Sequence, residues 1–561
     1  MQNQNGVLST FGGLDLLRPE VIEPTKMPRT AVIPVVRDLR TGYLNAATYS
    51  AGVFTTNPLR VLFGPKGADA IDAFRRAGEF CVAVPGREQI NHVWVTALEI
   101  PHGISEIDVA GWHELASRQI ATPGIEECPL NLECRNVFCQ ALPPPWRTLV
   151  IGEVAGVSID SNLLALPRSE VVKLYPMHEA GSHPDTGLYS PSVLSGEWVD
   201  AGGGRRVRAA AETYGAPRAG VGAQTGKTFV AGRELYLPEN ERVFMNAVWP
   251  RPAYIFLTSD EHGKVNALPL CGGSLQSTEP AVQIPLPLES AGYADVKRSG
   301  QFVVAVPDRT LIAHWEALAS DPQRSLAAAG FTPLKPNMVA APGLAECVVN
   351  MDCKRVMLED VPGTGHALLV GRRVGVSLSA KVVADLDPAR HTLHDRLAAC
   401  NEFYASFIYA VLDAGGVRRW GFHDRNMLSV RPLPSWGSRY TGGWWGPGPA
   451  LNYWLIELCQ SELISKADYY KVMYWLRLWN NGRLIPHFSE YIDDAARQEL
   501  RHRLTTLFRM MAWAHRDLEQ WGKVREFLAG FPNPPRDHHS GPEYHEPWRN
   551  PAQLHPDTRG I

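Results

Sequence analysis

The stretch at residues 122–135 reads TPGIEECPLNLECR, and residues 341–354 read APGLAECVVNMDCK. Pro, Gly, one Glu, Asn and both Cys stand at the same places in the two stretches, which are 219 positions apart. The chain is therefore predicted to contain two copies of one domain.

Other pairs of segments keep the same order. Residues 78–85 read GEFCVAVP and residues 300–307 read GQFVVAVP, with six of eight positions identical. Two shorter anchors keep nearly the same spacing: Pro28-Arg29 with Pro250-Arg251, 222 positions apart, and residues 152–158 with 371–377, 219 positions apart. Gene duplication is the economical interpretation. We place copy 1 at residues 25–190 and copy 2 at residues 240–389.

Each copy contains short apolar runs bounded by Pro, Gly or Asn, a pattern typical of strands. Expected strands are residues 31–36, 60–63, 80–84 and 149–157 in copy 1, and 253–258, 282–284, 302–306 and 368–378 in copy 2. Short helices are expected at 68–77 and 291–299. The predicted fold class is mainly β with α: two small split β-barrels in tandem, followed by an α-helical C-terminal extension.

The remaining segments have different compositions. Residues 1–24 are expected to form an N-terminal arm, and residues 191–239 a linker rich in Gly, Ala and Arg. Residues 390–530 are expected to form a helical domain, because apolar residues there return at helical spacing, and residues 531–561 a polar tail. The expected helices cover residues 393–411, 453–462, 467–479 and 493–527.

The charge and cysteine content exclude several classes of protein. The chain has 561 residues, with 55 Lys and Arg against 58 Asp and Glu, so no basic field favours nucleic acid or an anionic membrane surface. No signal peptide or long apolar run is present, and nine thinly spread cysteines fit reduced thiols, so we expect a cytoplasmic protein. Cys128, Cys134 and Cys139 lack metal-ligand spacing, and no metal site is predicted.

A polar segment follows the start of each copy. Copy 1 reads Pro28-Arg29 and then NAATYSAGVFTTNP at residues 45–58; copy 2 reads Pro250-Arg251-Pro252 and then NALPLCGGSLQSTEP at residues 266–280. Copy 1 also contains PHGISEID at residues 101–108. This order of motifs resembles the flavin-reductase-like branch of the FMN-binding split-barrel proteins. The resemblance implies a flavin site in each copy that retains the polar residues.

The resemblance also implies roles for individual residues. A flavin presents polar atoms along one edge of its ring, and its phosphate needs hydroxyl, amide and cationic donors. The implied cofactor-binding residues are Asn45, Ala46, Thr48 and Ser50 near the ribityl chain and phosphate, Thr55 and Thr56 at the ring edge, and Lys66 at the phosphate. Each also has a plain alternative: a turn at Asn45, strand-end capping by the threonines, or a solvated charge at Lys66.

Copy 2 departs from the pattern. It has Pro269 and Cys271 where copy 1 has Thr48 and Ser50, and it has no counterpart of Lys66. Copy 1 is therefore the better candidate site, and one or two flavins per chain both stay open. Proteins of this family usually dimerise, so the tandem resembles a dimer fused into one polypeptide, an internal pseudo-dimer. Association of whole chains into a homo-oligomer also stays open.

The catalytic residues are unknown from sequence. His178 is the first candidate to test, although a single His is more often structural than catalytic. Residues 220–228, GVGAQTGKT, look like a phosphate-binding loop, but the spacing before Gly-Lys is wrong for one. No Gly-x-Ser-x-Gly or Rossmann motif occurs, so NAD(P)H is expected only as a transient reductant.

These observations favour an FMN-dependent oxidoreductase, with FAD as the alternative cofactor and NAD(P)H:flavin reductase as the narrower version. The other hypothesis is a non-catalytic FMN- or haem-binding sensor or carrier. Residues 431–449 contain Trp436, Tyr440, Trp444 and Trp445 among glycines. Such a loop could cover a flavin and a flat substrate, so the expected partner is a small molecule, with an aromatic one as the specific hypothesis.

Overall fold

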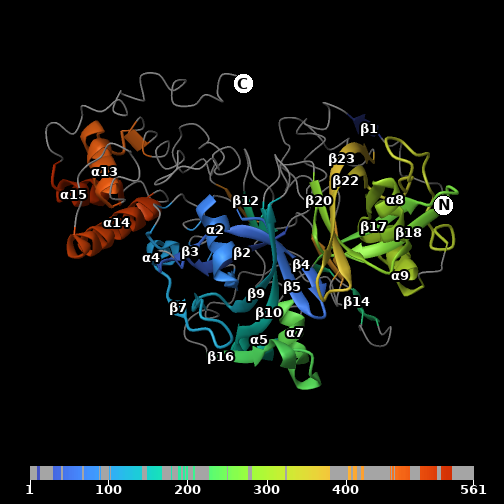
Figure 1. Ribbon diagram of the computed structural model, residues 1–561, viewed down its shortest axis with the longest axis horizontal. Coiled ribbons are helices and arrows are strands. Elements are labelled where there is room, and N and C mark those ends of the chain that lie inside the picture. The colour runs from blue at the N-terminus through green and yellow to red at the C-terminus, as the bar shows by residue number, and fades with distance from the viewer. Residues whose placement is uncertain are drawn as a thin grey trace.

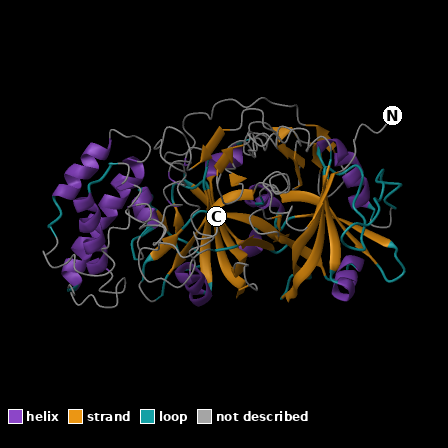
Figure 2. Cartoon of the chain, turned by 90° about the horizontal axis from the view of Figure 1, so that it is seen from above, coloured by secondary structure: helices purple, strands orange, loops and turns teal. Residues whose placement is uncertain are grey.

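In the computed structural model, two β-barrels lie side by side, and the C-terminal helices lie beyond the first barrel (Figure 1). The view from above in Figure 2 shows the same row: the C-terminal helices, then the first barrel, then the second barrel. The structure describes residues 9–12, 29–39, 42–65, 68–86, 89, 92, 96, 100, 103–141, 148–166, 178–179, 187–190, 194–195, 197–199, 206–208, 226–248, 251–275, 281–321, 325–379, 402–405, 409–412, 418–421, 455, 458–459, 462–479, 493–514 and 520–533. No described helix combines the length and apolar character that crossing a membrane requires.

The first barrel is a closed ring of antiparallel strands in the order β2-β4-β5-β10-β9-β6, closed by pairing of β6 with β2. Its elements are β2 Arg29–Arg37, β3 Leu44–Ala46, β4 Tyr49–Thr56, β5 Leu59–Phe63, α2 Ala68–Ala77, β6 Glu79–Val84, α4 Glu106–Ala110, β7 Glu114–Leu115, β8 Gly124–Ile125, β9 Leu130–Ala141, β10 Thr148–Asp160 and α5 Ser161–Ala165. The strands and helix expected in copy 1 are confirmed.

The second barrel repeats this arrangement in the order β17-β21-β22-β23-β20-β19, with β18 paired to β17. Its elements are α7 Glu241–Ala247, β17 Arg251–Ser259, β18 Val265–Cys271, β19 Ser274–Leu275, β20 Ala281–Pro287, α8 Ala291–Ser299, β21 Gln301–Val306, η6 Arg309–Leu311, α9 Ile312–Ser320, β22 Val349–Val361 and β23 His366–Leu378. The strands and helix expected in copy 2 are also confirmed. Apolar side chains fill the inside of each barrel.

The repeated residues make the same contacts in both barrels. The side chain of Asn131 accepts from the backbone N–H of Ile125 at 2.8 Å and donates to its carbonyl at 2.9 Å; Asn350 does the same with Leu344 at 2.7 and 3.0 Å. Likewise, a Cβ built on Gly152 would lie 2.3 Å from the ring of Phe80. The corresponding distance from Gly371 to Phe302 is 2.2 Å. Gly recurs at these positions because a ring occupies the space of a side chain.

Each barrel also receives strands from the other half of the chain. The strand β1 Ser9–Gly12 precedes the first barrel but pairs with β23 of the second, whereas β16 Lys227–Ala231 precedes the second barrel and pairs with β10 of the first. Gly12 faces Gly375, and Ala231 faces Gly156, so both pairings have the same register after a shift of 219 residues. The two halves are therefore interlocked.

The strands that follow each barrel in the chain also pair across the two halves. The hairpin of β11 His178–Glu179 and β12 Gly187–Ser190 adds to β2, and the hairpin of β24 Glu402–Ala405 and β25 Tyr409–Leu412 adds to β17. The strand β13 Leu194–Ser195 then pairs with β25, and β26 Arg418–Gly421 pairs with β12. The short strands β14 Glu197–Val199 and β15 Arg206–Arg208 form a separate pair.

The helix expected at residues 393–411 is wrong, because β24 and β25 occupy residues 402–405 and 409–412. A short run rich in aromatic and branched residues fits both helical and strand spacing, and the open edge of β17 decides for strand. The C-terminal helices are α13 Lys466–Trp479, α14 Asp494–Ala514 and α15 Trp521–Ala529. The helix expected at 467–479 is confirmed, and the one expected at 493–527 is two helices.

The expected linker also differs at its end. Residues 226–240 contain β16 and the 3₁₀ turns η4 Gly232–Glu234 and η5 Pro238–Asn240, and Val230 and Leu235 are buried against the first barrel. This part packs because β10 offers it a free edge. Residues 211–225 lie outside the described residues, as do most of 453–462 and the loop at 431–449.

Candidate functional site

The polar segment of copy 1 begins where the ladder on β2 is interrupted. Asn45 and Ala46 end β3 and pair with Val36 and Val35, and pairing resumes at Tyr49 of β4. Between them, Ala47 and Thr48 belong to no strand and are half-buried, as is Asn45. The segment therefore offers polar side chains beside backbone that is not fully engaged in the sheet.

A buried carboxylate holds this segment from behind. The backbone N–H of Ala46 donates to Oε2 of Glu106 at 2.9 Å, and Glu106 is the first residue of α4. Because this amide proton is engaged and the Ala46 side chain is fully buried, Ala46 contributes shape rather than a donor. Glu106 was not among the predicted site residues, although it is the Glu of the family-like stretch 101–108.

The threonine hydroxyls have different partners. Oγ1 of Thr48 lies 2.7 Å from Oγ1 of Thr96, another residue that the sequence did not point out. The Thr55 hydroxyl donates to the carbonyl of Pro58 at 2.6 Å across the turn from β4 to β5. Since a hydroxyl has one proton, Thr55 can offer a ligand only acceptor lone pairs. Thr56, which is half-buried, ends β4.

Ser50 lies in β4 opposite Ala31, and its side chain lies outside what the structure describes. Lys66 lies outside the described residues altogether. The structure brings the backbone of His178 to the same strand as the polar segment: Thr30 of β2 pairs with His178 on one edge and with Ala51 on the other. Two inter-strand spacings place these backbones about 10 Å apart.

Copy 2 closes the equivalent position with its own side chains. Asn266 corresponds to Asn45, and its side-chain amide donates to Oδ2 of Asp295 at 2.7 Å. The Thr258 hydroxyl donates to the same oxygen at 2.7 Å. Asp295 lies on α8, five residues before Gly300, and the residue five positions before the equivalent Gly78 is Ala73. Copy 1 thus lacks the carboxylate that accepts a hydrogen bond from the asparagine amide in copy 2.

The donor set of copy 1 suits a ligand with a polar edge and a negative charge. It combines the Asn45 amide, the Thr48 and Thr56 hydroxyls and, in sequence, the cation of Lys66 a few residues beyond β5. These groups fit the requirements of a flavin nucleotide by their chemistry.

The cysteines of the first barrel are not arranged as ligands. Burial raises the pKa of the Cys134 thiol, and the neighbouring Glu133 raises it further, so this thiol stays protonated and packs as an apolar group. The described part of the chain contains no group of three or more His, Cys, Asp or Glu side chains placed to hold a metal ion.

Lys227 of the Gly-rich stretch at 220–228 does not stand where a phosphate loop would place it. It lies in strand β16, where its ammonium forms an ion pair with the buried Asp160 and donates to the Cys128 carbonyl at 2.7 Å. A phosphate loop would instead place this lysine at the start of a helix.

Comparison with known proteins gives a match in the same region. Residues 26–173 match the family model described as Flavin reductase like domain. An uncharacterised protein of Methanothermobacter thermautotrophicus is 26% identical over 141 residues, which are 24% of this chain and 65% of that protein. One from Halalkalibacterium halodurans is 29% identical over 157 residues, 26% of this chain and 75% of that protein. The chain thus spans slightly under two thirds of the first relative.

Solved structures also resemble parts of the chain. Nitrilotriacetate monooxygenase component B from Bacillus cereus is 22% identical with a TM-score of 0.25, covering 28% of this chain and 84% of that one. Flavoredoxin of Desulfovibrio vulgaris is 14% identical with a TM-score of 0.24, covering 34% and 92%. The NADH:FAD oxidoreductase of Streptomyces globisporus is 18% identical with a TM-score of 0.22, covering 33% and 89%.

Proposed function

We propose that this chain, in which residues 26–173 form a flavin reductase like domain, binds one FMN in its first barrel and acts as a flavin-dependent oxidoreductase. The observation that carries the proposal is the position of the matched domain, which encloses every candidate cofactor residue from Asn45 to Lys66. FAD is the alternative cofactor, and NAD(P)H is the proposed transient reductant.

A bound flavin would supply hydride or electron transfer, and the chain would supply binding and orientation. Asn45 would donate to the polar part of the cofactor, Thr48 would place its hydroxyl there, and Lys66 would neutralise its phosphate. Glu106 would keep the backbone at Ala46 in place without touching the ligand. Because Asp295 already engages Asn266 in the second barrel, we propose one flavin per chain.

The proposal is tested on the purified full-length protein. Its absorbance spectrum and the flavin released on denaturation give the cofactor and its ratio to protein. Anaerobic addition of NADH or NADPH should then bleach the flavin band. A bound flavin that neither nicotinamide reduces would favour the non-catalytic carrier instead. A protein that takes up neither FMN nor FAD would overturn the proposal.

The substrate is proposed to be a small molecule, with an aromatic one as the specific hypothesis. It rests on the aromatic loop at residues 431–449, which lies outside the described residues. Replacing both Trp444 and Trp445 by Ala should then impair turnover while flavin content and melting temperature stay unchanged. A large fall in melting temperature would identify these indoles as core residues. His178→Gln, assayed in parallel, tests the candidate catalytic residue.

A further inference from the structure

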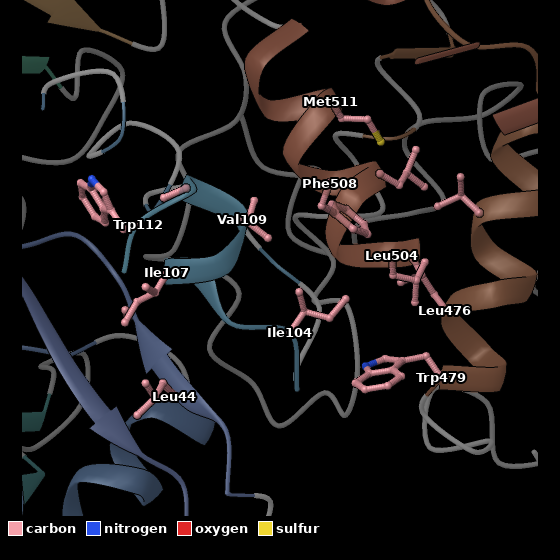
Figure 3. Packing of buried hydrophobic residues seen from close by; sticks show 14 of the residues in the cluster. Leu44, Ile104, Ile107, Val109, Trp112, Leu476, Trp479, Leu504, Phe508 and Met511 are labelled. Carbon is pink, nitrogen blue, oxygen red and sulfur yellow. The ribbon is translucent and has the colours of Figure 1, made fainter. Parts of the chain in front are cut away.

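The C-terminal helices α13, α14 and α15, which we call the helical unit, share one hydrophobic core with the first barrel. This core runs from Ala31, Ile33 and Val35 of β2 through α4 to side chains of α13, α14 and α15. Figure 3 shows Ile107 and Val109 of α4 between Leu44 and the helical side chains Leu504 and Phe508. The equivalent face of the second barrel, with Ala253, Ile255 and Leu257 of β17, is covered instead by residues that follow β21, including Leu311 and Trp315.

Polar contacts tie α14 to the end of α4. Nε of Arg509 donates to the carbonyl oxygen of Asp108 at 3.0 Å. The guanidinium of Arg501 lies 3.6 Å from Oδ2 of the same residue. The Asp108 carbonyl also accepts from the backbone N–H of Gly111 at 3.1 Å, and cationic groups are favourable beside the carbonyls at a helix C-terminus. The helical unit therefore holds α4 by its backbone as well as by apolar packing.

The helical unit also contacts the chain just before the polar segment. The guanidinium carbon of Arg501 lies 4.3 Å from the ring centroid of Tyr43, and the ring centroids of Tyr43 and Trp479 are 6.1 Å apart. Tyr43 is two residues from Asn45. Gly103 has a φ of +86°, and a Cβ there would lie 3.0 Å from Trp479 and 3.2 Å from Tyr43. Both ends of the segment from Tyr43 to Ala46 are thus held: one by Arg501 and Trp479, the other by Glu106 on α4.

We propose that the C-terminal helical unit sets the conformation of the flavin-binding segment, with Arg501, Arg509 and Glu106 as positioning residues. This inference rests on the proposed function. The three side chains act through Tyr43 and Ala46, while Asn45 and Thr48 bind the ligand. A flavin site in this chain then depends on a segment about 400 residues away, and a loosened helical unit lowers affinity for the flavin without changing any ligand-binding side chain.

The first test compares Arg501→Ala/Arg509→Ala with Arg503→Ala. Arg503 lies on the same helix and donates to Glu499 at 2.8 Å, so it is a matched control that loses a surface ion pair only. In flavin-free full-length protein, amide hydrogen exchange at residues 43–48 should be faster in the double variant and unchanged in the control. Equal exchange in all three proteins would overturn the proposal.

The second test measures FMN dissociation constants on the same proteins. The double variant should bind FMN roughly threefold to tenfold more weakly than the wild type. This is the change in dissociation constant that the net free energy of about one hydrogen bond produces. If wild type and double variant bind FMN equally tightly, the inference fails and the proposed function stands. If the wild type binds no FMN, both fail together.

The Glu106 variants test the last step of this path, from α4 to the Ala46 backbone, even if the double variant does not fold. Glu106→Gln keeps an oxygen that accepts from the Ala46 N–H, whereas Glu106→Ala does not. Slow exchange at residue 46 and tight FMN binding should survive in Glu106→Gln and be lost in Glu106→Ala. The same FMN affinity in both variants would show that the bond to Ala46 does not position the site.

Discussion

The backbone N–H of Gly273 donates a hydrogen bond to the carbonyl oxygen of Val53 at 3.1 Å, joining the two barrels. Gly273 is the repeat counterpart of Gly52, and a Cβ built on Gly52 would lie 2.1 Å from the Gly273 oxygen. A residue that meets its own counterpart is what a two-fold axis produces in a dimer. An apolar cluster also joins the two barrels, with members from both: Phe54, Leu62, Leu149, Ile151, Ala281, Met357, Val361, Leu368 and Val370.

We propose that the barrels behave as an internal pseudo-dimer, and Gly52→Ala tests this. The added methyl group has no space between β4 and Gly273, so the free energy of unfolding should fall by about 1–3 kcal/mol. Gly226→Ala is the control, because nothing lies within 4 Å of a Cβ at that position. Urea unfolding curves of both variants give the comparison. Equal stability would show that the barrels can separate at this contact without loss.

The exchanged strand β1 predicts an effect of the N-terminal arm on the distant second barrel. Deleting residues 1–12 removes the strand that pairs with β23 and leaves the β23 edge open. We expect a loss of about 1–3 kcal/mol, the scale of a few net hydrogen bonds. Deleting residues 1–8 only is the matched control, since it keeps β1. Thermal melting checks both deletions, and two identical curves would contradict the strand exchange.

Asn45 and Asn266 should respond oppositely to substitution. Asn45→Ala should weaken FMN binding by about 1 kcal/mol, roughly fivefold, with little change in stability. Asn266→Ala should leave FMN binding unchanged but lower stability by about 1–3 kcal/mol, because the buried Asp295 loses a donor. FMN titration and melting curves on both variants give four values. An equal loss of flavin from both variants would argue for two sites.

The buried pair of Lys227 and Asp160 predicts a pH-dependent stability. Removing one partner of a buried ion pair typically costs about 3–5 kcal/mol, so Lys227→Met should be strongly destabilised at neutral pH. Burial raises the pKa of Asp160 above its usual value, and Lys227 opposes that increase. The folded state therefore holds the Asp160 proton more tightly than the unfolded state does. The contribution of Asp160 to stability falls as pH rises from the usual aspartate pKa to the raised pKa of the folded state.

Without Lys227 the pKa of Asp160 should rise further, so the deficit of Lys227→Met relative to wild type should shrink as pH falls and Asp160 becomes protonated. Melting temperatures of both proteins across the acidic range measure this difference. A deficit that does not change with pH would mean that Asp160 keeps its charge without its partner. Lys227→Arg, which retains the cation, should show a smaller deficit.

Much of the fold was predictable because the repeated residues make the same packing contacts in both barrels. Gly124 and Gly343 leave room for Asn131 and Asn350, and the repeat alone identifies both pairs as equivalent. The strands bounded by Pro and Gly followed from local patterns, as did α2 and α8. The helix prediction failed at residues 402–412, because a short apolar run there fits helix and strand alike until the edge of β17 is available for pairing.

The sequence by itself determined two barrels and the polar segment at residues 45–56, because strand pattern and turn residues act locally. Only the tertiary structure decided that β1 pairs with β23, that Glu106 holds Ala46 from 60 residues away, and that Arg509 reaches Asp108 across 401 residues. Such partners are chosen by which sheet edges and apolar faces remain uncovered once the barrels have formed. That choice depends on the assembled surface, and no local pattern records it.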